Sequence, residues 1–385
     1  MTTIRESIRR LFAPVEPLPA GIYHYQAPPE EPDHFRLHLR MELDGTGVLI
    51  VNASTVLHLN TTAAEYAYHL VRCTSREEVA RSMSVRYHVT QAQILQDFTE
   101  FKDRIDTLIS TPDLDPVAYL DFERQKPHTG PISAPYRLDC ALTYRLPDST
   151  DPTFAPTARA ARELATIEWE SIMDKAWQAG IPHIVFTGGE PTLRDDLPKL
   201  ISHAETNGQV TGLLTDGYRL ANSAYLDSLL QTGLDHLVIL LNPVEDRIWA
   251  VTQSALQADL STTVHLTITS QNYPVVLDYL TRLSAMGLGS ISLSATDPEL
   301  KEQLRNAREI AAELHLSLVW DLPVPYSALN PFSLEFADHE RSVGTGRSWL
   351  YVEPDGDVLP GQGINQVLGN FLTDPWDKIW KPELG

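Results

Sequence analysis

The strongest constraint on the fold is a repeated pattern over residues 136–325, in which a short apolar strand-like run is followed by an amphipathic helix-like run. The strand-like runs are Tyr136–Leu142, His183–Phe186, Val210–Leu214, His236–Leu241, Thr263–Ile268 and Ser290–Ser294. Several of the helical runs stop at a glycine, the usual residue after a helix end, at Gly180, Gly208, Gly233 and Gly287. Six βα units spaced at about 25–30 residues predict an α/β fold with a parallel sheet, either open or curled into a partial (β/α)6 TIM-like barrel.

A different pattern precedes this region. Three alternating strand-like runs occupy Phe35–Met41, Gly47–Val51 and Val56–Leu59, and Asp44-Gly45 between the first two is a hairpin signal. Three helical runs follow, beginning behind the N-cap candidates Asn60, Ser75 and Thr90. Short strands followed by three helices predict a small α+β, winged-helix-like domain.

Proline-rich stretches separate these regions, since prolines crowd residues 1–35 and 111–135. We therefore predict a leader or linker at 1–35, a small domain at 36–110, a linker at 111–135, the barrel at 136–325 and a C-terminal extension at 326–385.

The net charge of −21 argues against nucleic acid and anionic membrane as partners, because a surface this acidic repels phosphate. A neutral or basic peptide fits this charge, although solubility alone accounts for it equally well. The sequence has no apolar run of the roughly 20 residues that span a bilayer, and its start has no secretory signal core. These features predict a cytoplasmic protein.

Only two cysteines are present, Cys73 and Cys140. This count excludes a disulfide scaffold and any cluster or structural zinc site that needs four protein thiolates. The sequence therefore predicts no metal site.

A glycine motif follows the second strand of the βα series, where the chain reads Thr187-Gly188-Gly189-Glu190-Pro191-Thr192. The two glycines leave room for close approach to the backbone, and Glu190 is expected to carry a carboxylate into the barrel mouth. As a bare pattern this segment is also compatible with a surface turn.

This segment resembles the glycine-glycine-glutamate-proline motif of radical S-adenosylmethionine (radical SAM) enzymes, whose glutamate accepts hydrogen bonds from the methionyl amine of the cofactor. Leu214-Thr215-Asp216-Gly217 resembles the Thr-Asn-Gly turn of the same family, with Asp216 in place of asparagine. The resemblance implies a radical SAM-type barrel in which S-adenosylmethionine is a possible cofactor. The cofactor-binding candidates are Gly188, Gly189, Glu190, Pro191, Thr215 and Asp216.

The resemblance breaks at the first strand. Family members carry Cys-x-x-x-Cys-x-x-Cys there, and each thiolate binds one iron of a [4Fe-4S] cluster. In the matching register this chain has Cys140, Tyr144 and Pro147. Cys140 is the only remaining position of the motif, so a [4Fe-4S] cluster is not expected. We interpret Cys140 as a small buried strand residue.

Both flanking regions also resemble parts of peptide-modifying radical SAM enzymes. Residues 344–360, with Leu368-Gly369-Asn370, resemble the SPASM/twitch extension, but Val343 and Gly361 stand where that extension has cysteines. Residues 47–109 resemble the PqqD-like domains that bind leader peptides, which implies that a precursor peptide adds as a strand at an open sheet edge. An accessory domain without this role is the alternative reading.

Three hypotheses follow. The first is a pseudoenzyme without catalytic residues that binds a precursor or leader peptide, or an active radical SAM partner, in ribosomal peptide or cofactor maturation. The second is a protein that binds S-adenosylmethionine or a nucleotide for non-radical chemistry. The third is an active radical SAM enzyme whose cluster has atypical ligands.

Overall fold

The structure is a computed structural model of the 385-residue chain. It describes residues 16–28, 30–31, 34–111, 132–147, 160, 162–242, 246–258, 260–319, 322, 344–362, 364 and 366–381. The chain divides into two compact units, Met1–Lys126 and Pro127–Gly385. The finer domain boundaries given above stay predictions.

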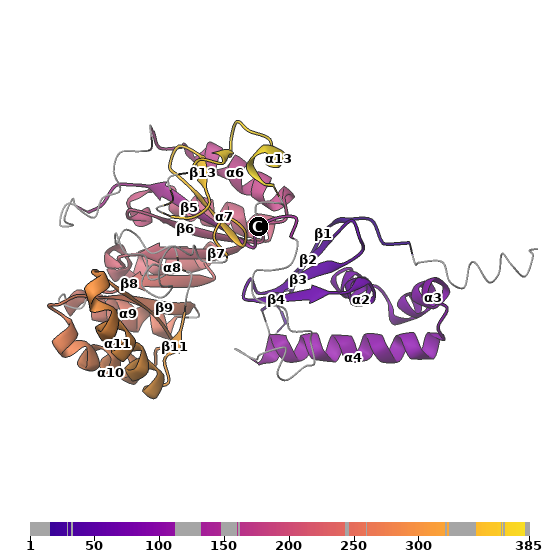
Figure 1. The fold of residues 1–385 in the computed structure, drawn as a ribbon, viewed down its shortest axis with the longest axis horizontal. Helices are drawn as coiled ribbons and strands as arrows, with labels where there is room; N and C mark the ends of the chain where they lie inside the picture. The colour runs from indigo at the N-terminus through magenta and orange to yellow at the C-terminus, as the bar shows by residue number, and fades with distance from the viewer. Residues whose placement is uncertain are drawn as a thin grey trace, which may run out of the picture. The chain divides into compact units, whose positions relative to one another are not determined.

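The first unit contains a four-stranded antiparallel sheet in the order β1-β2-β3-β4 (Figure 1). Its strands are β1 (Gly21–Gln26), β2 (Arg36–Met41), β3 (Gly47–Val51) and β4 (Thr55–Leu59). The last three confirm the predicted strand-like runs. Strand β1 was not expected, because it lies among the prolines that indicated a leader or linker. As an edge strand it pairs with β2 alone and is only partly buried, so its sequence has no strong apolar alternation.

Three helices complete this unit, α2 (Thr61–Val71), α3 (Arg76–Tyr87) and α4 (Gln91–Ser110). The predicted N-caps are confirmed, since the side chains of Asn60, Ser75 and Thr90 each accept a hydrogen bond from the backbone N–H three residues on. Helix α4 buries its apolar stripe, from Ile94 to Leu108, in the same core as the inward side chains of the sheet.

The second unit is built on a ten-stranded sheet in the order β11-β10-β9-β8-β7-β6-β5-β12-β13-β14. Its parallel series consists of β5 (Arg137–Thr143), β6 (His183–Gly188), β7 (Val210–Thr215), β8 (His236–Leu240), β9 (Ser261–Ile268), β10 (Ser290–Ala295) and β11 (Ser317–Leu318). Neighbouring strands follow one another in sequence, so right-handed crossovers place all connecting helices on one face. This topology is that of a partial TIM-like barrel and confirms the predicted fold class.

The helices of the series are α6 (Thr166–Gln178), α7 (Leu197–Asn207), α8 (Ser223–Gln231), α9 (Asp246–Gln257), α10 (Val276–Ala285) and α11 (Lys301–Glu313). The glycines predicted to stop helices all have φ between 88° and 92°, at Gly180, Gly208, Gly233 and Gly287. This left-handed conformation is the one that glycine adopts without strain.

The two faces of the parallel sheet differ in polarity. The face toward the helices is apolar and forms one core with residues such as Trp169 and Ile201. The opposite face carries polar side chains, and the imidazole of His265 lies 3.0 Å from Ser292 Oγ and 2.9 Å from Ser294 Oγ. Because this inner face is polar, apolar and polar residues alternate along the strands, which are therefore not continuous apolar runs.

A histidine pair spans strand β7 on the inner face. Nε2 of His183, on β6, lies 2.6 Å from Nε2 of His236, on β8. Gly212 on β7 leaves the space between them, because a Cβ there would stand 2.1 Å from the His236 ring. Burial lowers the pKa of both histidines, that of His236 to about 4, so both rings are neutral at pH 7.

The C-terminal segment extends the sheet beyond β5. Strand β12 (Trp349–Val352) pairs parallel with β5, and β13 (Asp357–Leu359) and β14 (Gly369–Asn370) follow antiparallel, before the short helix α13 (Trp376–Ile379). A turn at Asp355-Gly356 joins β12 to β13, with Gly356 at φ 91°. Val343 lies outside the described residues.

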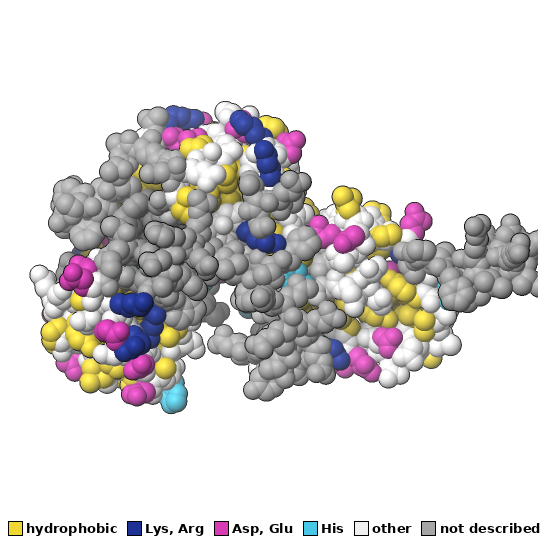
Figure 2. All heavy atoms as spheres, viewed as in Figure 1, with side chains coloured by type: hydrophobic (Ala, Val, Ile, Leu, Met, Phe, Trp, Pro, Cys, Tyr) yellow, Lys and Arg dark blue, Asp and Glu magenta, His cyan; other side chains and the backbone are white. Residues whose placement is uncertain are grey.

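The acidic side chains are dispersed. On the face shown in Figure 2, Asp and Glu side chains are interspersed with Lys and Arg rather than gathered into one patch. Within the part of the chain that the structure describes, no helix is long and apolar enough to cross a membrane.

Candidate functional site

The predicted site residues meet at the carboxyl ends of β6 and β7. Strand β6 ends at Gly188, and Glu190 then caps the short 3-10 helix η2 (Pro191–Leu193). Strand β7 ends at Thr215, beside Asp216. Because the two strands are parallel neighbours, their ends lie at the same edge of the sheet. The structure therefore brings all six predicted residues together.

The Glu190 carboxylate is the centre of this arrangement. Its Oε1 accepts hydrogen bonds from Thr192 N at 2.8 Å, from Thr192 Oγ1 and from Thr215 Oγ1 at 2.8 Å, and its Oε2 accepts one from Asp216 N at 2.8 Å. Four donors of the chain itself thus hold the carboxylate. They tie the turn after β6 to the end of β7.

Glu190 is also enclosed, with only 2% of its surface exposed. Burial, and after it the nearby Asp216 carboxylate, raise the pKa of Glu190 to about 8, and the donated hydrogen bonds oppose this rise only in part. A cationic group beside the two carboxylates would lower this pKa again. The sequence did not predict the enclosure, since the partners of Glu190 come from both strand ends.

The glycine pair is packed against the chain's own backbone. Gly189 N donates to Thr143 O at 2.7 Å, and Glu190 N donates to Arg145 O at 2.8 Å. A Cβ on Gly188 would stand 2.3 Å from Thr143 O, and one on Gly189 would stand 2.2 Å from Arg145 O. The close approach that requires these glycines is therefore made by residues 143–145, the segment that leaves β5.

The segment after β5 contains Tyr144 and Pro147, the positions at which the resemblance implies cysteines. Tyr144 turns toward the C-terminal strand β12, where its hydroxyl donates to Glu353 Oε1 at 3.1 Å and lies 3.4 Å from the Tyr351 hydroxyl. Arg145 donates from Nε to Thr143 Oγ1 and Glu163 Oε1. Protein side chains thus engage this segment on both sides.

Cys140 lies within β5, three positions before the strand ends, and not in the segment that follows it. It is fully buried in the core on the helix side of the sheet, together with Leu138 and Leu142. Burial raises the pKa of its thiol well above the usual value, and Asp139 adds to the rise. The prediction of a small buried strand residue is confirmed. Cys73, the other cysteine, is exposed at the end of α2 in the first unit.

The βα series, the glycine motif and the turn after β7 together can be compared with known families. Residues 140–293 match the family model of the radical SAM superfamily. These residues are therefore similar to a radical SAM domain.

Solved structures resemble the chain beyond this domain. The crystal structure of SuiB from Streptococcus suis is 15% identical, with a TM-score of 0.59 over 91% of this chain and 87% of SuiB. The same protein bound to S-adenosylmethionine is 14% identical, with a TM-score of 0.58 over 93% of this chain and 88% of that one. SuiB bound to its precursor peptide SuiA is 14% identical, with a TM-score of 0.58 over 89% and 86%. At these identities the likeness establishes the fold.

Further polar residues lie after β8 and on the C-terminal hairpin between β12 and β13. The Arg247 guanidinium stacks on the Tyr218 ring at 4.5 Å, whereas Trp249 on the same helix is buried. Carboxylate oxygens of Glu353, Asp355 and Asp357 lie within 4.8 Å of one another. These acids were not among the predicted site residues. The run Glu-Pro-Asp-Gly-Asp at the hairpin is the sequence pattern that could have indicated them.

Proposed function

We propose that this chain is a non-catalytic member of its fold, which binds a precursor peptide or an active radical SAM partner during the maturation of a ribosomal peptide or cofactor in the cytoplasm. The observation that carries the proposal is the contact between residues 143–145 and the glycine motif. In this contact the backbone of residues 143–145 packs directly against the two glycines, in the space that their missing side chains leave open.

The cysteines do not fit a [4Fe-4S] cluster. Three thiolates at one barrel mouth are needed to hold it. Of the two cysteines in the sequence, Cys140 packs on the helix side of β5 and Cys73 belongs to the other unit. Tyr144, at the second ligand position, is engaged with Glu353, and Pro147, at the third, has no donor atom. We therefore derive no radical chemistry for this chain.

The geometry of Glu190 supports a structural role for the motif. A carboxylate that binds an amine needs acceptor positions facing the ligand, whereas Oε1 of Glu190 already accepts three hydrogen bonds from the chain. We propose that Glu190 joins the ends of β6 and β7. Binding of S-adenosylmethionine through Gly188, Gly189 and Glu190 is the competing proposal.

The first unit supports the peptide-binding part of the proposal. Strand β4 has a sheet neighbour on one side only among the described residues, so its other edge can accept an added strand. SuiB, which resembles this chain over most of its length, has been crystallised with a precursor peptide. We propose a PqqD-like role for residues 47–109, with the peptide paired to β4.

The deciding experiment is anaerobic reconstitution of the full-length protein with iron and sulfide. We expect neither bound iron nor absorption near 400 nm, because three thiolates are required. Calorimetry with S-adenosylmethionine, run beside Glu190→Ala, is expected to show no heat that depends on Glu190. About four irons per chain would overturn the non-catalytic assignment. Cofactor binding that Glu190→Ala abolishes would overturn the structural role of Glu190.

Peptide binding needs a separate measurement. The probes are synthetic candidate precursor peptides, each made with and without N-methyl groups on alternate amides. We expect one unmodified peptide to bind and its methylated form to fail, because strand addition uses backbone N–H groups. Equal binding of both forms would contradict the pairing with β4.

A further inference from the structure

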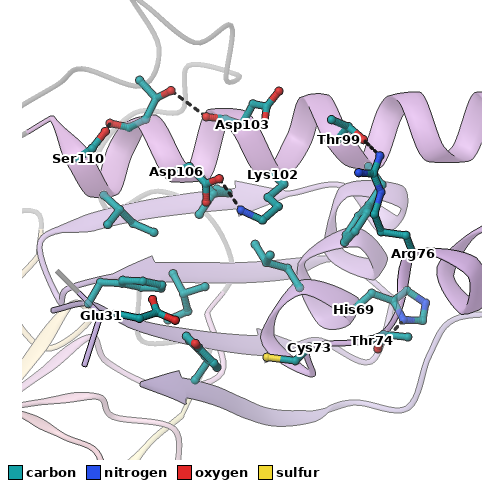
Figure 3. Close-up of a pocket in the computed structure, with 18 residues that line it drawn as sticks. Glu31, His69, Cys73, Thr74, Arg76, Thr99, Lys102, Asp103, Asp106 and Ser110 are labelled. Atoms are coloured by element: carbon teal, nitrogen blue, oxygen red, sulfur yellow. Dashed lines mark hydrogen bonds and ion pairs between the residues drawn. The ribbon is translucent and has the colours of Figure 1, made fainter. Parts of the chain in front are cut away.

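A groove runs along the C-terminal half of helix α4 in the first unit (Figure 3). Its volume is about 920 Å³. Its apolar walls come from the β1–β2 hairpin and from α4, and they include Tyr25, Phe35, Leu37, Phe98 and Ile105. Apolar walls of this extent favour an amphipathic occupant.

The charged residues around the groove are mostly acidic. Glu31, Asp103 and Asp106 line it, against Lys102 and Arg76. Lys102 is paired with Asp106, and Arg76 donates to Thr99 at 2.7 Å. Three carboxylates against two cations leave the groove a net charge of −1, which favours a basic occupant.

The chain contains a segment of matching chemistry. Residues 1–15 lie outside the described part of the chain, and their sequence places Ile4, Ile8, Leu11 and Phe12 at the spacing of one helical face. This segment also has three arginines and one glutamate, a net charge of +2 in a chain whose net charge is −21. It is both amphipathic and basic.

The first described residues lie close enough to the groove for residues 1–15 to reach it. The carbonyl oxygen of Glu16 accepts a hydrogen bond from Arg86 Nη2 at 2.6 Å, near the end of α3. Arg76 in the first turn of α3 lines the groove, about 15 Å away along the helix. Residues 13–16 in extended form span about 13 Å, and residues 4–12 in helical form add about 14 Å, so the apolar stripe reaches the groove.

We propose that residues 1–15 bind in this groove, with Ile8 and Leu11 toward its apolar walls and the arginines toward Glu31 and Asp103. The segment then competes with any peptide that enters along α4. This inference goes beyond the proposed function and does not depend on it, because the occupant is part of the chain itself.

Cys73 provides the test, since it lines the groove and is exposed, whereas Cys140 is buried. The measurement is the rate at which a bulky maleimide alkylates Cys73 in the full-length protein. We expect the double variant Ile8→Asp/Leu11→Asp to react about tenfold faster than wild type, as for a segment bound about 90% of the time. The control Thr2→Asp/Ala13→Asp adds the same charge on the opposite helical face and is expected to react at the wild-type rate.

Two further measurements identify the occupant. A synthetic peptide of residues 1–15, added to the Ile8→Asp/Leu11→Asp variant, should restore slow alkylation. The wild-type rate should not change with protein concentration, because the segment belongs to the same chain. Equal rates for wild type and the double variant would overturn the proposal, and so would protection that grows with concentration, which would assign the segment to a second copy.

Discussion

The carbonyl oxygen of Arg145 lies directly against Gly189, so closely that a Cβ on this glycine would stand 2.2 Å from it. Arg145 leaves the end of β5, and Gly189 follows β6. The hydrogen bond from Glu190 N to Arg145 O fixes this approach. The glycine motif is thus a contact between two neighbouring strand ends of the barrel.

Gly189→Ala tests this contact. We expect the free energy of unfolding to fall by about 1–3 kcal/mol, because the new methyl group meets backbone that cannot turn away as a side chain can. Urea denaturation measures the change. The control is Gly289→Ala, where a Cβ would meet no atom within 4 Å. An equal effect of both substitutions would show that the motif is not tightly packed.

Glu190→Gln tests the buried carboxyl group. The folded-state pKa of Glu190 is raised to about 8, above the ordinary value of 4.5. The stability that this group contributes is therefore fully present below pH 4.5 and is lost as the pH rises toward 8. We expect the difference in unfolding free energy between wild type and Glu190→Gln to change across this window, with wild type losing stability relative to the variant as the pH rises.

The control for this measurement is Ser254→Ala, which changes an exposed residue on α9 that has no ionisable group. Its difference from wild type should stay constant from pH 4.5 to 8. A difference for Glu190→Gln that is equally constant would mean that Glu190 is ionised like an exposed carboxylate.

For the pair His183 and His236 we predict the opposite dependence of stability on pH. Their folded-state pKa values are lowered below 6.5, that of His236 to about 4, so their contribution is present above pH 6.5 and is lost as the pH falls toward 4. We expect His236→Gln to reduce the loss of stability between pH 6.5 and 4, as measured by urea denaturation at several pH values. Ser254→Ala, at an exposed position on α9 without an ionisable group, should leave the loss unchanged.

The two thiols should differ in reactivity. Cys140 is fully buried with a raised pKa, and Cys73 is exposed, so a small thiol reagent should titrate one thiol per native chain and two after unfolding in urea. Cys73→Ser should remove the native reaction entirely. Rapid reaction of Cys140 in the native protein would place its thiol at an accessible barrel mouth instead of in the core.

Local patterns predicted most of the elements. The caps at Asn60, Ser75 and Thr90 depend on a side chain and a backbone N–H three residues away. The left-handed glycines depend on one residue alone. Strand β1 escaped prediction because it is held by pairing with β2, ten or more residues on, and not by a pattern of its own.

The sequence by itself determined the βα series, the place of the glycine motif after β6 and the small number of thiols, since each is a property of neighbouring residues or of a count. Only the tertiary structure decided what the motif touches. Glu190 takes its hydrogen bonds partly from Thr215 and Asp216, and the glycines meet residues 143–145. These partners lie 25 or more residues away along the chain, and the parallel pairing of β6 with β5 and β7 brings their backbones together.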